Sequence, residues 1–241
     1  MPNAPEHFSD DLAAIRTYYE GTFLKSTAWS LLHPHAFMYM RQRQRRIRDG
    51  LAELGFADPE KIAAIDVLDV GCGPGGNLAW VAELGADPAR CTGVDLVPSR
   101  IELANQRNSH MRWIAGDLLS EEVGGPYDFI MLLAVLTSVL NPALKRQLVA
   151  RCFELLKPGG GLFFYDLMTV KEHPGNDVYK MLTYGEAEDY FGGRDVRWFK
   201  RDYLRADLAK KLVPRFGVPF AELVQAVGWW NIEGSFAIVR K

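Results

Sequence analysis

The feature that most constrains the fold is a short apolar run that breaks into a glycine loop. Residues 67–77 read VLDVGCGPGGN, so Gly71 and Gly73 are the first of four glycines after the run. A glycine loop that follows a strand brings the backbone close to a bound nucleotide. The stretch therefore predicts a nucleotide site, and Asp69, just before the loop, bears on which nucleotide it holds.

Apolar and amphipathic segments alternate from this loop to the end of the sequence. Strands are expected at residues 67–70, 91–95, 111–115, 129–133, 161–166, 196–203 and 234–240. Helices fit between most of them, at residues 77–84, 99–108, 142–156 and 185–191. This order predicts an α/β fold with a doubly wound, seven-stranded, mostly parallel sheet. No long helix is expected between the last two strands, because Pro214 and Pro219 interrupt that segment.

An arginine-rich run, RQRQRRIR at residues 41–48, precedes the first strand. Met40, Ile47 and the leucines that follow recur on one face, so the helix is amphipathic and the arginines surround its polar side. A solvated basic face is the favoured interpretation. The alternative is that Arg41 or Arg45 turns inward to hold a carboxylate.

The overall charge gives no attraction to polyanions. The 241-residue chain has a net charge of -2 and a pI near 6.2, which predicts binding neither to nucleic acid nor to an anionic membrane. Its three cysteines fit free core thiols in a reducing cytoplasm. The first residues lack a signal-peptide pattern, and the longest apolar run, residues 129–140, is too short to span a bilayer. A cytoplasmic protein that acts on a small molecule is therefore expected.

Three carboxylates discriminate among nucleotides. Asp95 ends the second expected strand, about 20 residues after the loop, where a carboxylate accepts both ribose hydroxyls. Asp117 ends the next strand, where it could accept a hydrogen bond from an adenine amino group. Asp69 would repel a diphosphate and attract a cation, and the loop lacks the Gly-Lys-Ser/Thr ending that binds ATP phosphates. A nucleoside with a cationic tail, such as S-adenosylmethionine (SAM), fits best.

The motifs of residues 65–168 resemble those of class I SAM-dependent methyltransferases. VLDVGCGPGGNLAWVAELG resembles the first motif, and GVDLVPSRIELA, IAGDLLS, YDFIMLLAVL and LKPGGGLFFYDL resemble the following motifs in order and spacing. The resemblance implies the strand order 3-2-1-4-5-7-6 with strand seven antiparallel. The flanking segments are similar to a bacterial branch from natural-product and polysaccharide pathways.

The resemblance also implies a set of cofactor contacts. It places Gly71 and Gly73 beside the methionine moiety with Asp69, Asp95 on the ribose and Asp117 near the adenine. The expected SAM-binding residues are Asp69, Gly71, Gly73, Asn77, Asp95, Leu96, Asp117, Leu118, Leu133, Tyr18, Tyr19 and Arg45. No metal is expected.

Residues 1–58 are expected to form an N-terminal helical lid and substrate region. Residues 59–241 then form a Rossmann-like SAM-binding domain with a cap inserted around residues 167–195. Aromatic faces near a sulfonium are favourable because of cation–π attraction, so the lid tyrosines are placed over the cofactor.

The acceptor region is expected above the fourth and fifth strands. Its candidate catalytic residues are Tyr165, Asn141 and Tyr179, and His173 is a further candidate base. Methyl transfer from a sulfonium needs alignment and exclusion of water more than a strong base.

Three functions agree with these motifs. The leading one transfers a methyl group from SAM to an oxygen or nitrogen of a small-molecule or peptide natural-product intermediate, leaving S-adenosylhomocysteine. The second is a SAM cyclase that forms azetidine-2-carboxylate and methylthioadenosine, with Asn141 or Tyr179 holding the SAM amine. The third is a non-catalytic SAM-binding regulator.

Overall fold

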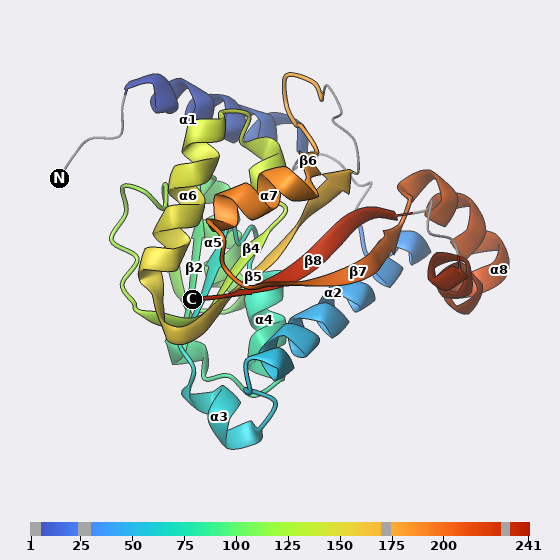
Figure 1. Cartoon of the computed structure of the whole chain (residues 1–241), viewed down its shortest axis with the longest axis horizontal. Helices are drawn as coiled ribbons and strands as arrows, with labels where there is room; N and C mark the ends of the chain where they lie inside the picture. Colours follow the sequence, from blue (N-terminus) through green and yellow to red (C-terminus); the bar gives the residue numbers. More distant parts are fainter. Residues whose placement is uncertain (1–5, 24–29, 170–174, 228–231) are drawn as a thin grey trace.

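A single twisted sheet with helices on both faces forms the centre of the molecule in the computed structural model, which describes residues 6–23, 30–169, 175–227 and 232–241 (Figure 1). Its strands are β1 (Val67–Val70), β2 (Cys91–Asp95), β3 (Arg112–Ala115), β4 (Tyr127–Leu133), β5 (Leu156–Thr169), β6 (Leu182–Thr183), β7 (Val196–Leu204) and β8 (Ile232–Arg240). The helices are α1 (Glu6–Tyr18), α2 (Pro34–Glu53), α3 (Pro59–Ala64), α4 (Gly76–Glu83), α5 (Pro98–Arg107), α6 (Pro142–Leu155), α7 (Tyr184–Phe191) and α8 (Ala206–Val227). Three short turns join them: η1 (Tyr19–Phe23), η2 (Pro88–Arg90) and η3 (Leu136–Ser138).

The sheet has the strand order that the methyltransferase resemblance implies. The path is β3-β2-β1-β4-β5-β8-β7, with the short β6 paired to β5 outside it. Strands β1 to β5 run parallel, and β8 is antiparallel to both β5 and β7. The predicted doubly wound, mostly parallel sheet with an antiparallel seventh strand is therefore confirmed. The two-residue β6 was not predicted.

Two hydrophobic cores cover the two faces of the sheet, and the central strands contribute to both. In β4, Phe129 and Met131 enter one core while Ile130 and Leu132 enter the other. Side chains alternate between faces along a strand, so a strand buried on both sides needs an unbroken apolar run. This is why the apolar stretches of the sequence located β1, β2 and β4.

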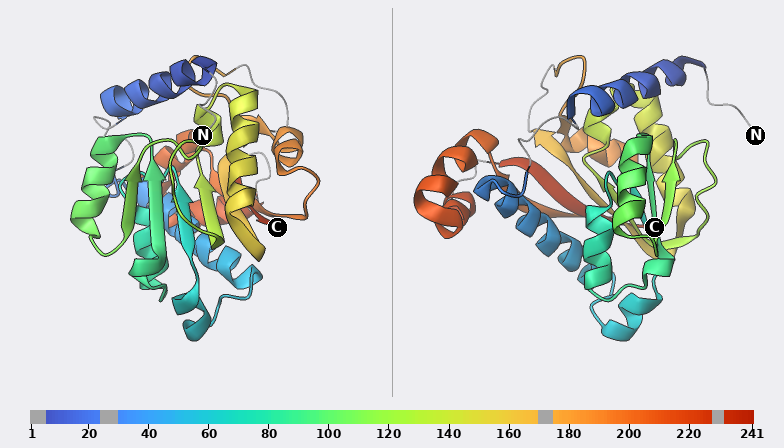
Figure 2. Two further views of the ribbon diagram at one scale, coloured as in Figure 1. Left: turned by 90° about the vertical axis from the view of Figure 1, so that its left-hand side faces the viewer. Right: turned by 180° about the vertical axis from the view of Figure 1, so that it is seen from behind.

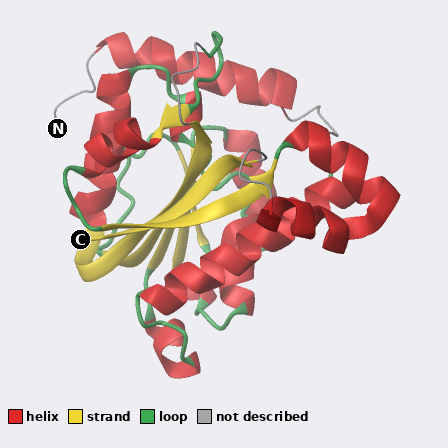
Figure 3. Ribbon diagram, turned by 45° about the vertical axis from the view of Figure 1, so that its right-hand side comes forward, coloured by secondary structure: helices red, strands yellow, loops and turns green. Residues whose placement is uncertain are grey.

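The segment between the last two strands differs from the prediction. Residues 206–227 are helical, although a long helix was not expected there, and the helix is broken at Gly217, which has φ 81° and ψ 169°. The break starts a second helical segment, so Pro219 stands in a first turn, where its missing N–H costs little. Figure 3 shows α8 as bent helical segments that project from the sheet.

The two ends of the sheet carry different structures. Helix α1 lies across the end where the parallel strands finish, and α3 lies at the opposite end (Figure 2). Helix α2 packs instead against one face of the molecule, beside α8. Among the described helices, none combines the length and apolarity that a bilayer span requires.

A candidate SAM and acceptor pocket

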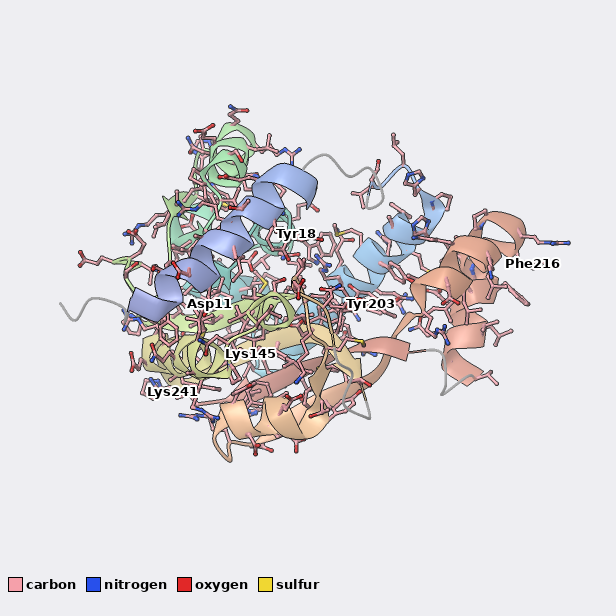
Figure 4. All side chains as sticks on the ribbon, turned by 90° about the horizontal axis from the view of Figure 1, so that it is seen from above. Asp11, Tyr18, Lys145, Tyr203, Phe216 and Lys241 are labelled. Atoms are coloured by element: carbon pink, nitrogen blue, oxygen red, sulfur yellow. The ribbon has the colours of Figure 1, made fainter. Side chains whose placement is uncertain are left out.

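A cavity of about 630 Å³ lies at the carboxyl ends of the parallel strands, where open α/β sheets bind ligands. Its walls come from the loops after β1, β2, β3, β4 and β5 and from parts of α1, α2 and α8. Tyr18 at the end of α1 and Tyr203 at the end of β7 both line it, and Figure 4 views this end from above.

The glycine loop after β1 forms the floor of the cavity. Gly71 and Gly73 have φ of 70° and 53°, a left-handed conformation that favours glycine. A Cβ on Gly71 would lie 2.6 Å from the Val135 side chain. The amides of Gly71 and Cys72 both donate to the carbonyl of Val94, which fixes the loop to β2. Both predicted glycines line the cavity.

Asp95 is held with its two carboxylate oxygens in fixed directions. One oxygen accepts the amide of Gly73 at 2.8 Å, and the other accepts the amide of Val97 at 2.9 Å. The Arg100 guanidinium lies 3.8 Å away. A carboxylate offers about four lone-pair sites, so each oxygen can still accept a hydroxyl from the cavity. This geometry suits the two hydroxyls of a ribose.

Asp69 lies behind the cavity wall rather than in it. It is fully buried, and one oxygen accepts a hydrogen bond from the side-chain amide of Asn77 at 3.3 Å. Its other oxygen has no hydrogen-bond partner among the described residues. Burial raises the pKa of the Asp69 carboxyl to about 7, although Asn77 and Arg43 act in the opposite direction. Asn77 lines the cavity, so a cation there would meet this carboxylate at close range.

The wall after β2 and β3 contains the residues predicted to surround an adenine. Leu96, Asp117 and Leu118 all line the cavity. Asp117 accepts the amide of Leu119 at 3.2 Å, and burial raises the pKa of its carboxyl. Two apolar side chains beside a fixed hydrogen-bonding group form a suitable site for a planar base.

Arg43, and not Arg45, is the arginine of α2 that reaches the cavity. The Arg43 Nε donates to the Tyr203 hydroxyl at 3.3 Å, and both residues line the cavity. Arg45 is outside the cavity: its side chain is 55% exposed and pairs with Glu222 at 3.4 Å. The periodicity that places Met40 and Ile47 on the inner face also turns position 43 inward, and sequence reasoning missed this signal.

Both predicted lid tyrosines line the cavity. The Tyr19 hydroxyl lies 2.6 Å from the Ser138 hydroxyl, and the Arg100 guanidinium lies 4.5 Å from the centre of the Tyr19 ring. Tyr18 packs edge-on against Tyr19, with 5.2 Å between ring centres. Burial raises the pKa of Tyr19, so its hydroxyl stays protonated and can donate.

The candidate catalytic residues separate into two groups. Tyr165, Tyr179 and the cofactor residue Leu133 line the cavity. Asn141 does not: its side chain caps α6 by accepting the amide of Ala143 at 2.9 Å and donates to Asp11 at 3.0 Å. An asparagine directly before a Pro-initiated helix is a typical N-cap, and this corrects its predicted catalytic placement. His173 lies outside the described residues.

Asp166, at the cavity end of β5, is fully buried and accepts several bonds. The amides of Thr137 and Leu167 donate to it at 3.0 Å each, and the Thr137 hydroxyl bonds the same carboxylate. Burial raises the pKa of Asp166 to about 7. With three hydrogen bonds, two of them from Thr137, Asp166 fixes the loop after β4 to β5. No cluster of metal-ligating residues occurs in the described part of the chain.

Comparison with known proteins gives the class first. Residues 39–210 match the family described as a methyltransferase domain, which is well over half of the chain. The chain belongs to this methyltransferase domain family. Its strand order and carboxyl-end cavity are those expected of the class I fold.

Similar individual proteins include curated methyltransferases that match over part of their length. The chain is 30% identical over 128 residues to the ubiquinone biosynthesis O-methyltransferase of Acinetobacter baumannii (strain ACICU), covering 50% of each protein. It is 33% identical over 127 residues to the protein of that name from Pseudomonas paraeruginosa, covering 50% of this chain and 51% of the relative. The chain therefore spans about half the length of these relatives.

Solved structures share the fold at low identity. Magnesium protoporphyrin IX methyltransferase of Synechocystis PCC 6803, solved with bound SAM, is 15% identical with a TM-score of 0.63 and full coverage of both chains. The 1,6-didemethyltoxoflavin-N1-methyltransferase of Burkholderia thailandensis is 18% identical with a TM-score of 0.57, covering 100% of this chain and 92% of the other.

Proposed function

We propose that this protein binds SAM and transfers its methyl group to an oxygen or nitrogen of a small-molecule or peptide natural-product intermediate. The observation that carries the proposal is one continuous cavity with two unlike halves. One half holds the fixed carboxylates and glycine loop of a nucleoside site, and the other is walled by tyrosines and apolar side chains.

The nucleoside half accounts for each part of SAM. Asp95 accepts the ribose hydroxyls, and Asp117 accepts the adenine amino group. The methionine end lies on the loop of Gly71 and Gly73, whose lack of side chains permits close approach. The buried carboxylate of Asp69 attracts the ammonium group, and Arg43 binds the carboxylate.

The remaining space favours an external methyl acceptor. Leu133 and Ala134 leave β4 where the sulfonium is expected, and the cavity continues past them to Val178 and Tyr179. Its volume lies in the range of about 300–1,000 Å³ typical of small-molecule sites. SAM cyclisation needs no such acceptor space. Asn141, one of the two residues suggested to hold the SAM amine for cyclisation, also lies outside the cavity.

The reaction is an in-line displacement. A lone pair of the acceptor forms the new bond to the methyl carbon while the carbon–sulfur bond breaks, and its electrons remain on sulfur as S-adenosylhomocysteine. The protein aligns the two atoms and excludes water, and tyrosine faces stabilise the sulfonium by about 0.5–2 kcal/mol. No side chain is assigned here as the base, so the proposed acceptor is a nucleophile that ionises readily and loses its proton to solvent.

The helical segments around the cavity support the proposed lid. The π-helical turn η1 follows α1 and begins with Tyr19, whose hydroxyl meets Ser138 on the acceptor side. Arg16 of α1 donates to the carbonyl of Leu96 at 3.0 Å on the nucleoside side. We assign residues 1–58 as a lid and substrate region and residues around 167–195 as a cap.

Mass spectrometry of SAM products tests this function. SAM incubated with the protein alone should stay intact, and S-adenosylhomocysteine should form in proportion to methylated product once a phenol or amine acceptor is supplied. Methylthioadenosine formed without an acceptor would instead identify the cyclase. Tight SAM binding with no turnover across acceptor classes would identify the regulator.

A further inference from the structure

Most of the exposed large hydrophobic side chains among the described residues lie in α8, in α2 or just before α2. We call the side of the molecule formed by α2 and α8 the apolar edge, and its exposed residues are Leu32, Phe37, Phe216, Phe220, Leu223 and Val227. Leu223 and Val227 are 59% and 71% exposed. Figures 1 and 2 place the amino end of α2 beside α8, and Figure 4 shows Phe216 on the outer side of α8, away from α1. Exposed apolar side chains on neighbouring helices are typical of an interaction site.

The charge of this edge differs from that of the whole protein. The chain carries 28 lysines and arginines against 30 aspartates and glutamates. Helices α2 and α8 have the opposite balance, with eight basic residues (Arg41, Arg43, Arg45, Arg46, Arg48, Lys210, Lys211 and Arg215) and four acidic ones (Asp49, Glu53, Asp207 and Glu222). Helices α2 and α8 are therefore basic on a slightly acidic protein.

Several of these cations are available to a partner. Arg41, Lys210, Lys211 and Arg215 are exposed and form no ion pair within the described part of the chain. The Arg215 guanidinium lies 5.5 Å from the centre of the Phe216 ring, and that ring lies 4.9 Å from Phe220. Cations interleaved with exposed aromatic and aliphatic side chains are typical of helices that lie in a membrane interface.

We propose that the apolar edge docks this protein on an anionic lipid surface. Phe216, Leu223 and Val227 enter the headgroup boundary, while Lys210, Lys211 and Arg215 face the lipid phosphates. A second copy fits less well, because a two-fold interface would bring the same basic helices together. The apolar edge also adjoins the cavity. Leu31, next to Leu32, and Ala206, the first residue of α8, both line the cavity. Docking would bring the cavity rim to the lipid. The inference does not depend on methyl transfer.

Vesicle co-sedimentation tests the proposal. The full chain should sediment with phosphatidylglycerol–phosphatidylcholine vesicles, much less with phosphatidylcholine alone, and less as salt rises. Two variants, Leu223→Ser/Val227→Ser and Lys210→Gln/Lys211→Gln/Arg215→Gln, should each lower the partition coefficient at least about tenfold. Matched controls are Leu140→Ser and Lys61→Gln/Arg107→Gln/Arg146→Gln, which change exposed residues elsewhere and should bind as the wild type does.

Two further measurements separate a loss of lipid binding from a loss of folding or of cofactor binding. S-adenosylhomocysteine binding and melting temperature should be unchanged in all variants, because none of the substituted residues lines the cavity. The proposal is overturned by absence of vesicle binding, by equal binding to neutral vesicles, or by edge variants that bind like the wild type. A concentration-dependent dimer that Leu223→Ser/Val227→Ser dissociates, with no vesicle binding, would overturn it in favour of a second copy.

Discussion

At the scale of single residues, the site combines a rigidly held hydrogen-bond acceptor, Asp95, with a buried carboxyl group, Asp69. Asp95 is fixed by two backbone amides at 2.8 and 2.9 Å, so it is preorganised for its ligand. Asp69 is fully buried with one oxygen unpartnered among the described residues. Desolvation disfavours the charged form of such a group, and a cation in the adjacent cavity would counteract this effect. Arg43 places a positive charge close to it.

Arg43 should bind the carboxylate of the methionine moiety. Arg43→Met is expected to weaken S-adenosylhomocysteine binding by about 1.5–3 kcal/mol, because a charge-assisted bond is lost. Methylthioadenosine lacks that carboxylate, so its affinity should change little. Calorimetry with both ligands measures the difference. Arg45→Met, which alters an exposed arginine of the same helix, is the control, and equal losses for both ligands would contradict the assignment.

SAM affinity should rise with pH through about 7. The pKa of Asp69 is raised to about 7 by burial, so below that pH the free protein holds a proton that an ammonium ligand must displace. Binding then releases a proton, and affinity increases with pH until the carboxyl is ionised without ligand. Titrations between pH 5.5 and 8.5, in the range where this group changes state, measure the slope. The Asp69→Asn variant should bind SAM weakly, with an affinity that does not change with pH. If its affinity rose with pH as in the wild type, Asp69 would be excluded as the source of the pH dependence.

At the scale of elements, the four predicted helices and strands β1 to β4 lie within two residues of their observed bounds, because their signals are local. Apolar runs buried on both faces located β1, β2 and β4, whereas α8 was not predicted. Pro214 and Pro219 locally oppose a helix, but the break at Gly217 lets a second helical segment begin, and Pro219 lies in its first turn. Asn141 shows a local signal that was missed: an asparagine directly before a helix that begins with proline is a typical N-cap, and Asn141 caps α6.

The proposed lid also depends on contacts that the sequence cannot indicate. The Tyr19–Ser138 bond joins residues 119 positions apart, and no local periodicity encodes such a pair. The presence of tyrosines near the cavity was predictable from their position in the first helical region. The hydrogen-bond partner of each tyrosine was not predictable.

The Tyr19–Ser138 bond should slow release of the cofactor. Tyr19→Phe and Ser138→Ala are each expected to raise the dissociation rate of S-adenosylhomocysteine by about 3- to 10-fold, since each removes one hydrogen bond of about 0.5–1.5 kcal/mol. The double variant should be no faster than either single one, because the same bond is lost. Stopped-flow displacement measures the rates. Additive effects would show that the two residues act separately.

At the scale of the whole molecule, the two proposed functional regions lie on different sides of the sheet. The carboxyl ends of the strands form the cavity, and the α2–α8 side forms the apolar edge. Whole-chain charge predicted no attraction to an anionic membrane, but α2 and α8 together carry eight basic and four acidic residues, an imbalance that a total cannot show. The antiparallel β8 lies between β5 and β7, and α8 joins β7 to β8 across a broken helix.

A crystal structure with bound S-adenosylhomocysteine tests the central claim most directly. The account predicts the ribose hydroxyls on Asp95, the ligand carboxylate on Arg43, and the sulfur near Leu133 with open cavity toward Tyr179. Those positions would give an acceptor an in-line path to the methyl carbon of SAM. A ligand bound away from the glycine loop, or a sulfur sealed by protein on the side facing Tyr179, would contradict methyl transfer as the function of this cavity.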